Sequence, residues 1–287
     1  MKIKESRKAS FAAMFFIYLF ISAVGVVTFH FLPFGIYLNL FIADVIATVA
    51  IFIISVLLKN ASVYDPYWSM QPIIISFLLA TVKGIGLPAL FLLIAIGIWG
   101  VRLTANWAYT FKGLLYEDWR YVLLKEKTGV WYPLINFIGI HMIPTVVVYL
   151  CVLPAVFVIQ ESPTFNAVAI IFFILSIFAV ILQGVSDIEM HVYRQNRTEP
   201  FMRRGLWKYS RHPNYLGEIL MWWGVGFYAF VLLPDKWYLL SGAVANTLLF
   251  IFVSIPMADK RQAKKEGFAE YKKETFALLP LPKLIRK

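Results

Sequence analysis

Eight stretches of the chain are apolar over roughly the length that a helix needs to cross a bilayer, about 20 residues. They cover most of the 287 residues, of which 60% are hydrophobic and only 15% are charged. Soluble domains carry about 25% charged residues, so the sequence excludes a soluble globular enzyme, a disordered protein and a nucleic-acid-binding domain. It predicts an all-α integral membrane bundle of about eight transmembrane helices, with seven also compatible. The predicted spans are 10–31, 34–58, 68–82, 87–111, 131–159, 165–191, 213–233 and 237–255.

The distribution of basic residues predicts how these spans are oriented. With the N-terminus inside, the outer loops are 32–33, 83–86, 160–164 and 234–236. These loops hold only Lys83 and Lys236 of the 27 Lys and Arg residues. Because cytoplasmic loops collect Lys and Arg, we expect both termini to be cytoplasmic, in a multi-pass protein of a bacterial inner membrane. A count of seven or nine spans would place either the basic segment 194–211 or the basic tail outside.

We expect one integral membrane domain over 1–287, in which the first two spans (10–58) carry no motif and the informative region is 60–283. A single cysteine, Cys151, excludes a disulfide framework, and the four histidines show no metal-ligand spacing. The expected partners are membrane lipid and a lipidic small molecule, with no nucleic acid and no metal. Apolar spans suit a transporter, a channel or an enzyme, so function depends on polar residues at membrane depth.

The sixth span carries the most polar helix face in the chain. Gln183, Asp187, His191 and Arg194 are spaced by 4, 4 and 3 residues, which places them on one face of a helix. An acid below the lipid headgroups is costly and usually has a partner or a function. The alternative is a helix that leaves the membrane with its polar face among the headgroups.

A basic segment, 194–211, follows this face with six basic residues and one acid, Glu199. One interpretation is attraction to anionic lipid. The other is a polyphosphate site, favoured by Gly205, which lets the backbone approach a ligand, and by Pro213, which suits the first position of a helix. A helix N-terminus beside arginines can bind an anion.

The seventh span opens with a second polar stripe, Asn214, Glu218 and Trp222, at i, i+4 and i+8. Glu218 could simply complement the positive end of the helix or pair with a loop arginine. Alternatively, Asn214 and Glu218 face Gln183 and Asp187 across a cofactor cleft. Weaker signals are Asp44, near the middle of the second span, and His141, which we expect to be structural.

Four segments resemble the steroid 5-alpha-reductase superfamily (C-terminal-domain type), in the bacterial membrane branch known as a domain of unknown function. The segment 204–218, Arg-Gly-Leu-Trp-Lys-Tyr-Ser-Arg-His-Pro-Asn-Tyr-Leu-Gly-Glu, resembles its C-terminal signature. The other three are 60–69, then 99–102 with 116–121, and the tail 268–280. The resemblance implies an all-helical membrane reductase that takes NADPH from the cytoplasmic side. The implied substrate is a lipid-soluble enone such as a 3-oxo-4-ene steroid.

The resemblance also implies roles for individual residues. Gln183 and Asp187 match a cofactor-binding Asn/Gln-x-x-x-Asp pair, and Asn214 and Glu218 match contacts to the nicotinamide-ribose end. The residues implied to bind the phosphates or other parts of the cofactor are Arg102, Arg194, Arg203, Arg204, Tyr209, His212 and Tyr215.

The candidate catalytic residues are Asp65 and Trp99. Steroid reductases use a Gln-Glu pair in an early span and a Tyr in the next one. This chain lacks the Gln-Glu pair, Asp65 is the nearest acid to that place, and Trp99 stands where a Tyr is expected.

Two other functions remain open. Isoprenylcysteine-type membrane methyltransferases also carry Arg-His-Pro-x-Tyr and a similar tail but bind S-adenosylmethionine, and they lack the Gln-x-x-x-Asp helix and the 60–68 segment. The second alternative is a non-enzymatic lipid-binding protein that keeps the fold.

Overall fold

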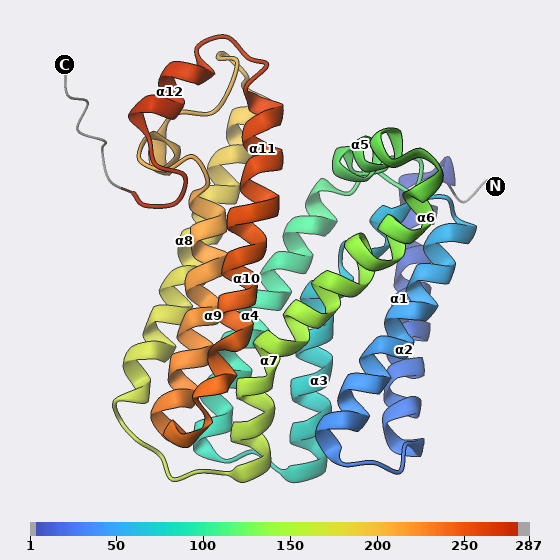
Figure 1. Cartoon of the computed structure of the whole chain (residues 1–287), viewed down its shortest axis with the longest axis vertical. Coiled ribbons are helices and arrows are strands. Elements are labelled where there is room, and N and C mark those ends of the chain that lie inside the picture. The colour runs from blue at the N-terminus through green and yellow to red at the C-terminus, as the bar shows by residue number, and fades with distance from the viewer. Residues whose placement is uncertain (1–3, 281–287) are drawn as a thin grey trace. The chain divides into compact units, whose positions relative to one another are not determined.

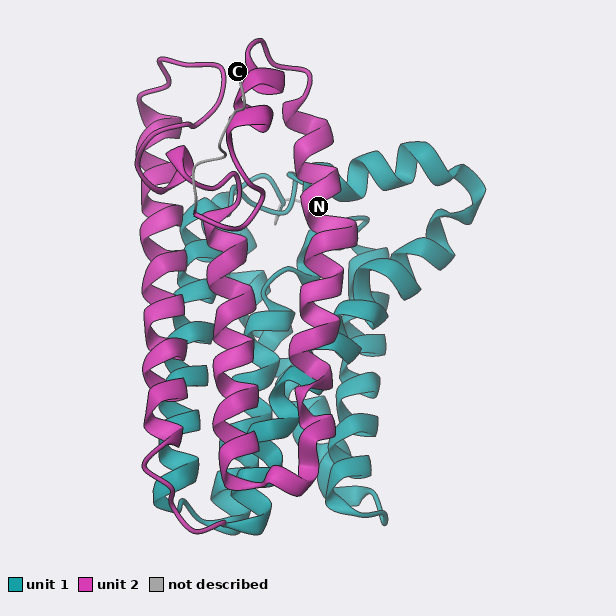
Figure 2. Ribbon diagram, turned by 60° about the vertical axis from the view of Figure 1, so that its left-hand side comes forward, with its two compact units in different colours: residues 1–162 teal, residues 163–287 magenta. Residues whose placement is uncertain are grey.

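The computed structural model describes residues 4–280, and helices make up most of that part of the chain. The described residues contain an isolated β-bridge, between Ser210 and Phe276. The chain divides into two compact units, 1–162 and 163–287 (Figure 2), where the sequence predicts a single domain. The division falls in the connection between two helices, and each unit is described by itself below. Lys2 of the basic N-terminal tail and residues 281–283 of the predicted informative region lie outside the described residues.

The first unit is a bundle of long helices joined by short connections (Figure 1). The antiparallel helices α1 and α2 pack on each other, and α3 packs on α4 and α7. The α-helices are α1 (Arg7–Phe31), α2 (Ile36–Leu57), α3 (Tyr67–Lys83), α4 (Leu87–Thr110), α5 (Trp119–Thr128), α6 (Tyr132–Ile135) and α7 (Ile143–Glu161). Shorter turns are η2 (Ala61–Tyr64) and η3 (Gly129–Trp131), and η4 (Asn136–Met142) is a π-helix.

Local sequence explains where these helices begin. The Ser6 hydroxyl accepts a hydrogen bond from the Ala9 backbone N–H and caps α1. Asp118 caps α5 in the same way, through the Arg120 N–H. Pro88 lies in the first turn of α4, where a missing N–H costs nothing. Polar caps and proline therefore mark helix starts within a largely apolar sequence.

The fifth predicted span is part of a longer helical stretch than the sequence predicts. Helical structure runs from Trp119 to Glu161 through α5, α6, η4 and α7. The amphipathic helix α5 runs at a steep angle to α7 (Figure 1). Residues 119–128 mix charged and apolar side chains, and the apolar run that predicts a span starts only at Trp131. The sequence analysis therefore did not predict helix α5.

The second unit is a bundle of three long helical segments with a small cap formed by the tail and the loop after α8 (Figure 1). Its α-helices are α8 (Ala169–Gln195), α9 (Pro213–Leu232), α10 (Ser241–Leu249), α11 (Ile255–Gln262) and α12 (Phe268–Glu274). The turns η5 (Gly205–Lys208) and η6 (Pro234–Leu240) connect them, and the π-helix η7 (Phe250–Ser254) joins α10 to α11.

Helices α8 and α9 pack unusually closely because glycines lie at their contact. A Cβ atom on Gly217 would lie 2.7 Å from the Ala179 carbonyl oxygen, and one on Gly224 would lie 2.2 Å from the Ser176 hydroxyl. Lipid is as apolar as a leucine side chain, so close backbone approach at small residues is what holds such helices together. This contact aligns the polar faces of the two helices.

The structure confirms an all-helical fold of the multi-pass membrane type. Within residues 4–280, seven helical stretches are long and apolar enough to cross a membrane. The remaining predicted span, 68–82, corresponds to α3, which is helical over 17 residues. The orientation of the termini stays a prediction.

Candidate functional site

The two polar stripes predicted from the sequence meet in the second unit. Gln183 Nε2 of α8 donates a hydrogen bond to Glu218 Oε2 of α9 over 2.7 Å, and Trp222 Nε1 donates to Glu218 Oε1 over 2.8 Å. One turn away, Asn214 Nδ2 donates to Asp187 Oδ1 over 3.4 Å. Glu218 is therefore a buried carboxylate with a donor on each oxygen, which is how an acid is tolerated in an apolar setting.

Two polar atoms of this face have no hydrogen-bond partner among the described residues. They are Gln183 Oε1 and Asn214 Oδ1, and both are buried. Buried amide oxygens are nearly always satisfied. These two acceptors, beside Asp187, are therefore the atoms that a ligand with amide or hydroxyl donors would engage.

Arg203 and Arg204 share one carboxylate in the basic segment. Arg203 Nε and Arg204 Nη2 each lie 2.7 Å from an oxygen of Glu199. Their hydrogen bonds hold the pKa of Glu199 below its usual value. A groove of about 390 Å³ runs beside them, lined by the end of α8 and residues 196–205. The groove is also lined by Glu189, so two carboxylates and two guanidinium groups face it and their formal charges balance.

Gly205 lies against a side chain of the protein itself, whereas the sequence analysis expected it to let the backbone approach a ligand. Its φ angle is +57°, and an added Cβ would lie 2.1 Å from a carboxylate oxygen of Glu189 on α8. That carboxylate accepts the Leu206 N–H over 3.0 Å. Gly205 thus lets the protein's own Glu189 cap the η5 turn. The sequence analysis did not single out Glu189, because it lies off the face formed by Gln183 and Asp187.

The tail forms hydrogen bonds with the residues that start α9. The backbone N–H groups of Arg211 and His212 donate to the carbonyls of Phe276 and Ala277 over 3.1 and 3.0 Å. Buried Asp259 of α11 accepts from both side chains: Arg211 Nη2 is 3.1 Å and His212 Nε2 2.9 Å from its oxygens. The Arg-His-Pro motif therefore ties α9 to α11 and the tail.

The other predicted cofactor residues are dispersed. The His212 ring stacks on Tyr215, with centroids 5.0 Å apart, while Arg194 and Tyr209 are exposed on the surface of the second unit. Arg102 lies half-buried on α4 of the first unit. The second unit thus brings together Gln183, Asp187, Asn214 and Glu218, with Arg203 and Arg204 on the following loop.

The predicted catalytic residues lie in the first unit. Asp65 ends η2 and accepts a hydrogen bond from the Tyr121 hydroxyl over 2.6 Å. Burial raises the pKa of Asp65 to about 7. Trp99 is fully buried within α4, so its ring fills the core of this unit.

Two of the motif segments are joined to each other around Asp65. Asn60 Nδ2 donates to the carbonyls of Leu114 and Tyr116, and the Ala61 N–H donates to Glu117. These contacts connect segments about 55 residues apart in the chain, and they bring two of the four motif segments together.

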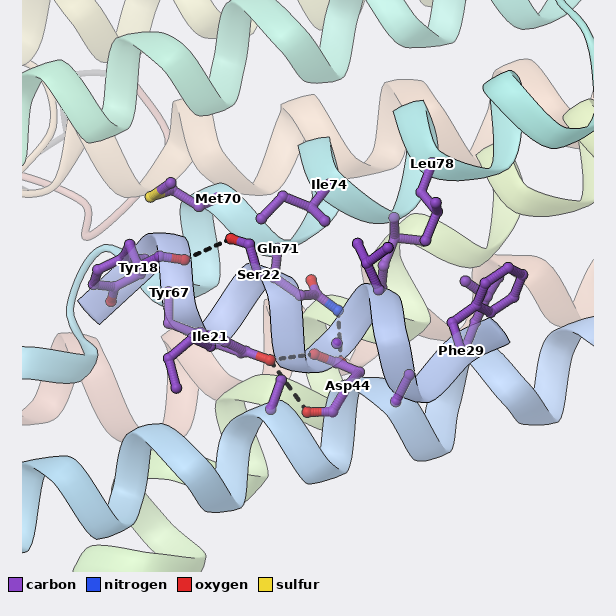
Figure 3. A pocket seen from close by; sticks show the side chains of 16 residues that line it. Tyr18, Ile21, Ser22, Phe29, Asp44, Tyr67, Met70, Gln71, Ile74 and Leu78 are labelled. Carbon is purple, nitrogen blue, oxygen red and sulfur yellow. Dashed lines mark hydrogen bonds between the residues drawn. The ribbon is translucent and has the colours of Figure 1, made fainter. Parts of the chain in front are cut away.

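The sequence analysis missed a buried polar cluster deeper in the first unit. The Tyr67 hydroxyl donates to Asp44 Oδ1 over 2.7 Å, and Gln71 Nε2 donates to Asp44 Oδ2 over 2.6 Å. Tyr67 and Gln71 are one turn apart on α3, and their side chains converge on Asp44 of α2 (Figure 3). An acid inside an apolar span was the available signal, and we gave it little weight.

The Asp44 cluster lines an apolar pocket between α1, α2 and α3. The pocket has a volume of about 50 Å³ and is lined by 16 residues. Apart from the cluster, its wall is largely aliphatic and aromatic, with Ile21, Phe29 and Leu78 among the lining side chains (Figure 3). A small set of polar groups in an apolar wall is typical of a small-molecule site.

Comparison with known proteins places the chain in a family. The family described as "Protein of unknown function (DUF1295)" matches residues 51–275. The chain belongs to the DUF1295 family. The matched region contains Tyr67 and Gln71 and begins seven residues after Asp44.

The chain is also similar to an uncharacterized protein of Schizosaccharomyces pombe. The two are 28% identical over 207 residues, which is 62% of this chain and 59% of the yeast protein. The chain thus matches less than two thirds of that relative's length. No solved structure is significantly similar to the chain.

Proposed function

We propose that this DUF1295 protein is a membrane reductase that uses NADPH to reduce the C=C bond of a lipid-soluble enone, as steroid 5-alpha-reductases do. The observation that carries the proposal is the buried Asp44–Tyr67 pair in an apolar pocket. Such a pair can polarise the carbonyl of an enone in a site from which water is excluded. The motifs shared with the reductase superfamily support the same reaction class.

Tyr67 is the group that would touch the substrate oxygen. Its hydroxyl lies 2.7 Å from Asp44 Oδ1, so a proton can pass between the two groups. A hydrogen bond from Tyr67 to the enone oxygen withdraws electrons from the β-carbon and stabilises the enolate that forms there. Asp44 in its protonated form then returns a proton to Tyr67 and becomes a carboxylate, and Gln71 fixes the orientation of that carboxylate.

The second unit offers contacts that fit a nicotinamide dinucleotide. When bound, NADPH supplies the hydride. The unpartnered oxygens of Gln183 and Asn214 can accept from an amide or ribose hydroxyls, and Asp187 can accept from a hydroxyl. Arg203 and Arg204 carry guanidinium groups of the kind that pair with phosphates, and a phosphate would replace Glu199 as their partner. We place this end of the protein at the cytoplasmic face, where the basic residues gather.

The pocket volume bears on the substrate. Ordinary small-molecule pockets measure about 300–1,000 Å³, whereas the pocket beside Asp44 measures about 50 Å³. That space accepts the enone end of a slender lipid more readily than a four-ring steroid. We therefore favour an open-chain or single-ring enone with a long apolar tail over a 3-oxo-4-ene steroid.

The test is turnover by the purified full-length protein in lipid nanodiscs. We expect NADPH oxidation with a long-chain alkyl enone, and a product heavier by two hydrogens in mass spectrometry. Asp44→Asn should lower kcat by roughly 10²- to 10⁴-fold, the range for general acid catalysis, with unchanged NADPH affinity. Asp235→Asn, at an exposed acid of the second unit, is the matched control and should keep full activity.

Two results would refute the proposal. One is full turnover by Asp44→Asn. The other is S-adenosylmethionine binding with methyl transfer to a lipid and no response to NADPH, which would make the protein a methyltransferase of the isoprenylcysteine type.

A further inference from the structure

Gln71 uses only one half of its side-chain amide in the Asp44 cluster. Its Nε2 donates to Asp44 Oδ2 over 2.6 Å (Figure 3), whereas its Oε1 is buried and has no hydrogen-bond partner among the described residues. Gln71 is 5% exposed and lines the pocket beside Asp44. Buried amide oxygens are nearly always satisfied, because an unmade hydrogen bond is costly there. Oε1 is therefore an acceptor that a ligand in the pocket would satisfy.

The orientation of the Gln71 amide follows from the bonds of Asp44. The Tyr67 hydroxyl donates to Asp44 Oδ1, so Oδ2 is the oxygen that Gln71 binds. Reversing the amide would set Oε1 against Oδ2, and both are acceptors. When Asp44 is protonated, the proton that returns to Tyr67 lies on Oδ1, and Oδ2 still accepts from Nε2. Oε1 is thus available to a ligand in both states of Asp44.

Its place in the pocket distinguishes Gln71 from other buried amides. Gln160 of α7 also has a buried Oε1 without a partner among the described residues, but it does not line this pocket. The other hydroxyl-bearing residues in the wall, Tyr18 and Ser22, donate to backbone carbonyls. Among the described residues that line the pocket, Gln71 is therefore the one with an unpartnered buried acceptor.

We propose that Gln71 Oε1 selects an enone with a hydroxyl group on a carbon next to its carbonyl, an inference that rests on the proposed reductase function. Tyr67 and Gln71 bind the two oxygens of one carboxylate, so their polar groups gather at one end of the pocket. A substrate whose carbonyl accepts from Tyr67 therefore presents the group beside that carbonyl to Gln71. A hydroxyl in that position donates to Oε1 and satisfies it.

The pocket favours a small, neutral donor. Its wall is largely aliphatic and aromatic, and both oxygens of Asp44 are already bonded. A charged ammonium group would be costly in such a place. The volume of about 50 Å³ is also small, since a single water takes up about 30 Å³ of liquid. A hydroxyl adds one heavy atom to the enone, so the substrate class is a hydroxy-enone with a long apolar tail.

The experiment compares two long-chain enones of similar shape, with NADPH and the purified full-length protein. One carries a hydroxymethyl group on its carbonyl carbon. The other carries an ethyl group there, so that a methyl replaces the hydroxyl. A site that binds a substrate hydroxyl rejects the analogue without it, because the buried acceptor stays unpaired. We expect kcat/KM to be roughly 10- to 100-fold higher for the hydroxymethyl ketone.

Gln71→Met removes the acceptor and keeps the length of the side chain. It also removes the bond to Asp44 Oδ2, so kcat should fall with both ketones. The preference for the hydroxymethyl ketone should be lost as well, which loss of carboxylate orientation alone would not cause. Because the reactivity of each ketone is the same with both proteins, the change in preference measures the contact made by Oε1.

Gln160→Met is the matched control, since it makes the same change at a glutamine outside the pocket. It should keep the wild-type kcat and the wild-type preference. Thermal midpoints show whether the variants are folded, and Gln71→Leu repeats the test if the methionine variant does not fold.

Equal kcat/KM for the two ketones with the wild type would overturn the role of Oε1 and leave the reductase function intact. So would a folded Gln71 variant that retains the preference, because the hydroxyl would then bind elsewhere. Failure of the wild type to oxidise NADPH with either ketone would overturn both proposals.

Discussion

The carboxylates Asp44 and Glu218 are held in the same way, although they lie in different units. Each accepts one hydrogen bond on each oxygen, Asp44 from Tyr67 and Gln71, and Glu218 from Gln183 and Trp222. A carboxylate in an apolar region needs such donors or it takes up a proton. Asp187 differs, because it is only half-buried and its hydrogen bond from Asn214 is long, at 3.4 Å.

This difference predicts separate effects of two conservative substitutions. Asp187→Asn removes a charged acceptor that a cofactor hydroxyl would use, which typically costs about 1.5–3 kcal/mol. NADPH affinity should therefore fall roughly 10- to 150-fold, with little change in thermal midpoint. Glu218→Gln places an amide against two buried donors and should lower the thermal midpoint as well.

Calorimetric or fluorescence titration with NADPH and thermal unfolding, on the same preparations, check both variants. If Asp187→Asn binds NADPH like the wild type, the polar face of α8 is not a cofactor site. A drop in stability alone would then assign these acids a structural role.

At the scale of elements, the pairing of α8 with α9 positions all four polar residues of the second unit. Gly217 lies one residue before Glu218 and faces the Ala179 carbonyl and Gln183 of α8. The same close contact that packs the helices therefore sets the distance between Gln183 and Glu218. The tail has a comparable role at the start of α9, through Asp259 and the carbonyls of Phe276 and Ala277.

Gly217→Ala should separate α8 from α9. Its Cβ would lie 2.7 Å from a backbone oxygen, and overpacking of this kind costs about 1–3 kcal/mol. We expect a lower thermal midpoint and weaker NADPH binding together. Gly97→Ala in α4 is the matched control, because its Cβ would lie 3.9 Å from Phe77, and it should be neutral or slightly stabilising. Equal stability of the two variants would contradict close packing at Gly217.

At the scale of the whole molecule, membrane orientation is the property that the charges predict. The predicted outer loops hold only two of the 27 basic residues, and the 17-residue helix α3 occupies the third predicted span. If α3 crosses the membrane, the count is even and both termini are on the same side. If it does not, the termini lie on opposite sides.

We therefore expect both ends to be cytoplasmic. A green fluorescent protein fused after Lys287 should fluoresce in a bacterial host, and an alkaline phosphatase fused there should be inactive. A phosphatase fused after Gly84, in a predicted outer loop, is the positive control. Active phosphatase at the C-terminus would mean that one of the eight segments does not cross.

The sequence alone determined the long apolar helices, the membrane class and the polar faces of the second unit. These features are local: a span depends on a run of apolar residues, and Gln183 and Asp187 share a face because of helical periodicity. Facing stripes on consecutive antiparallel spans could be expected because both stripes lie near the helix ends that residues 196–212 connect. For the same reason Asn214 and Glu218 were correctly singled out as neighbours of that face.

Only the tertiary structure decided which distant groups meet. Asp44 and Tyr67 lie 23 residues apart on different helices, and Thr48 and Thr145 lie 97 residues apart. The sequence around each of these residues does not predict the contacts. They depend on which helix faces pack together and on how far the helices are shifted along their axes. The same holds for Gly205, whose close neighbour is Glu189. Helix periodicity places a side chain on a face, but its partner is fixed only when the helices have packed.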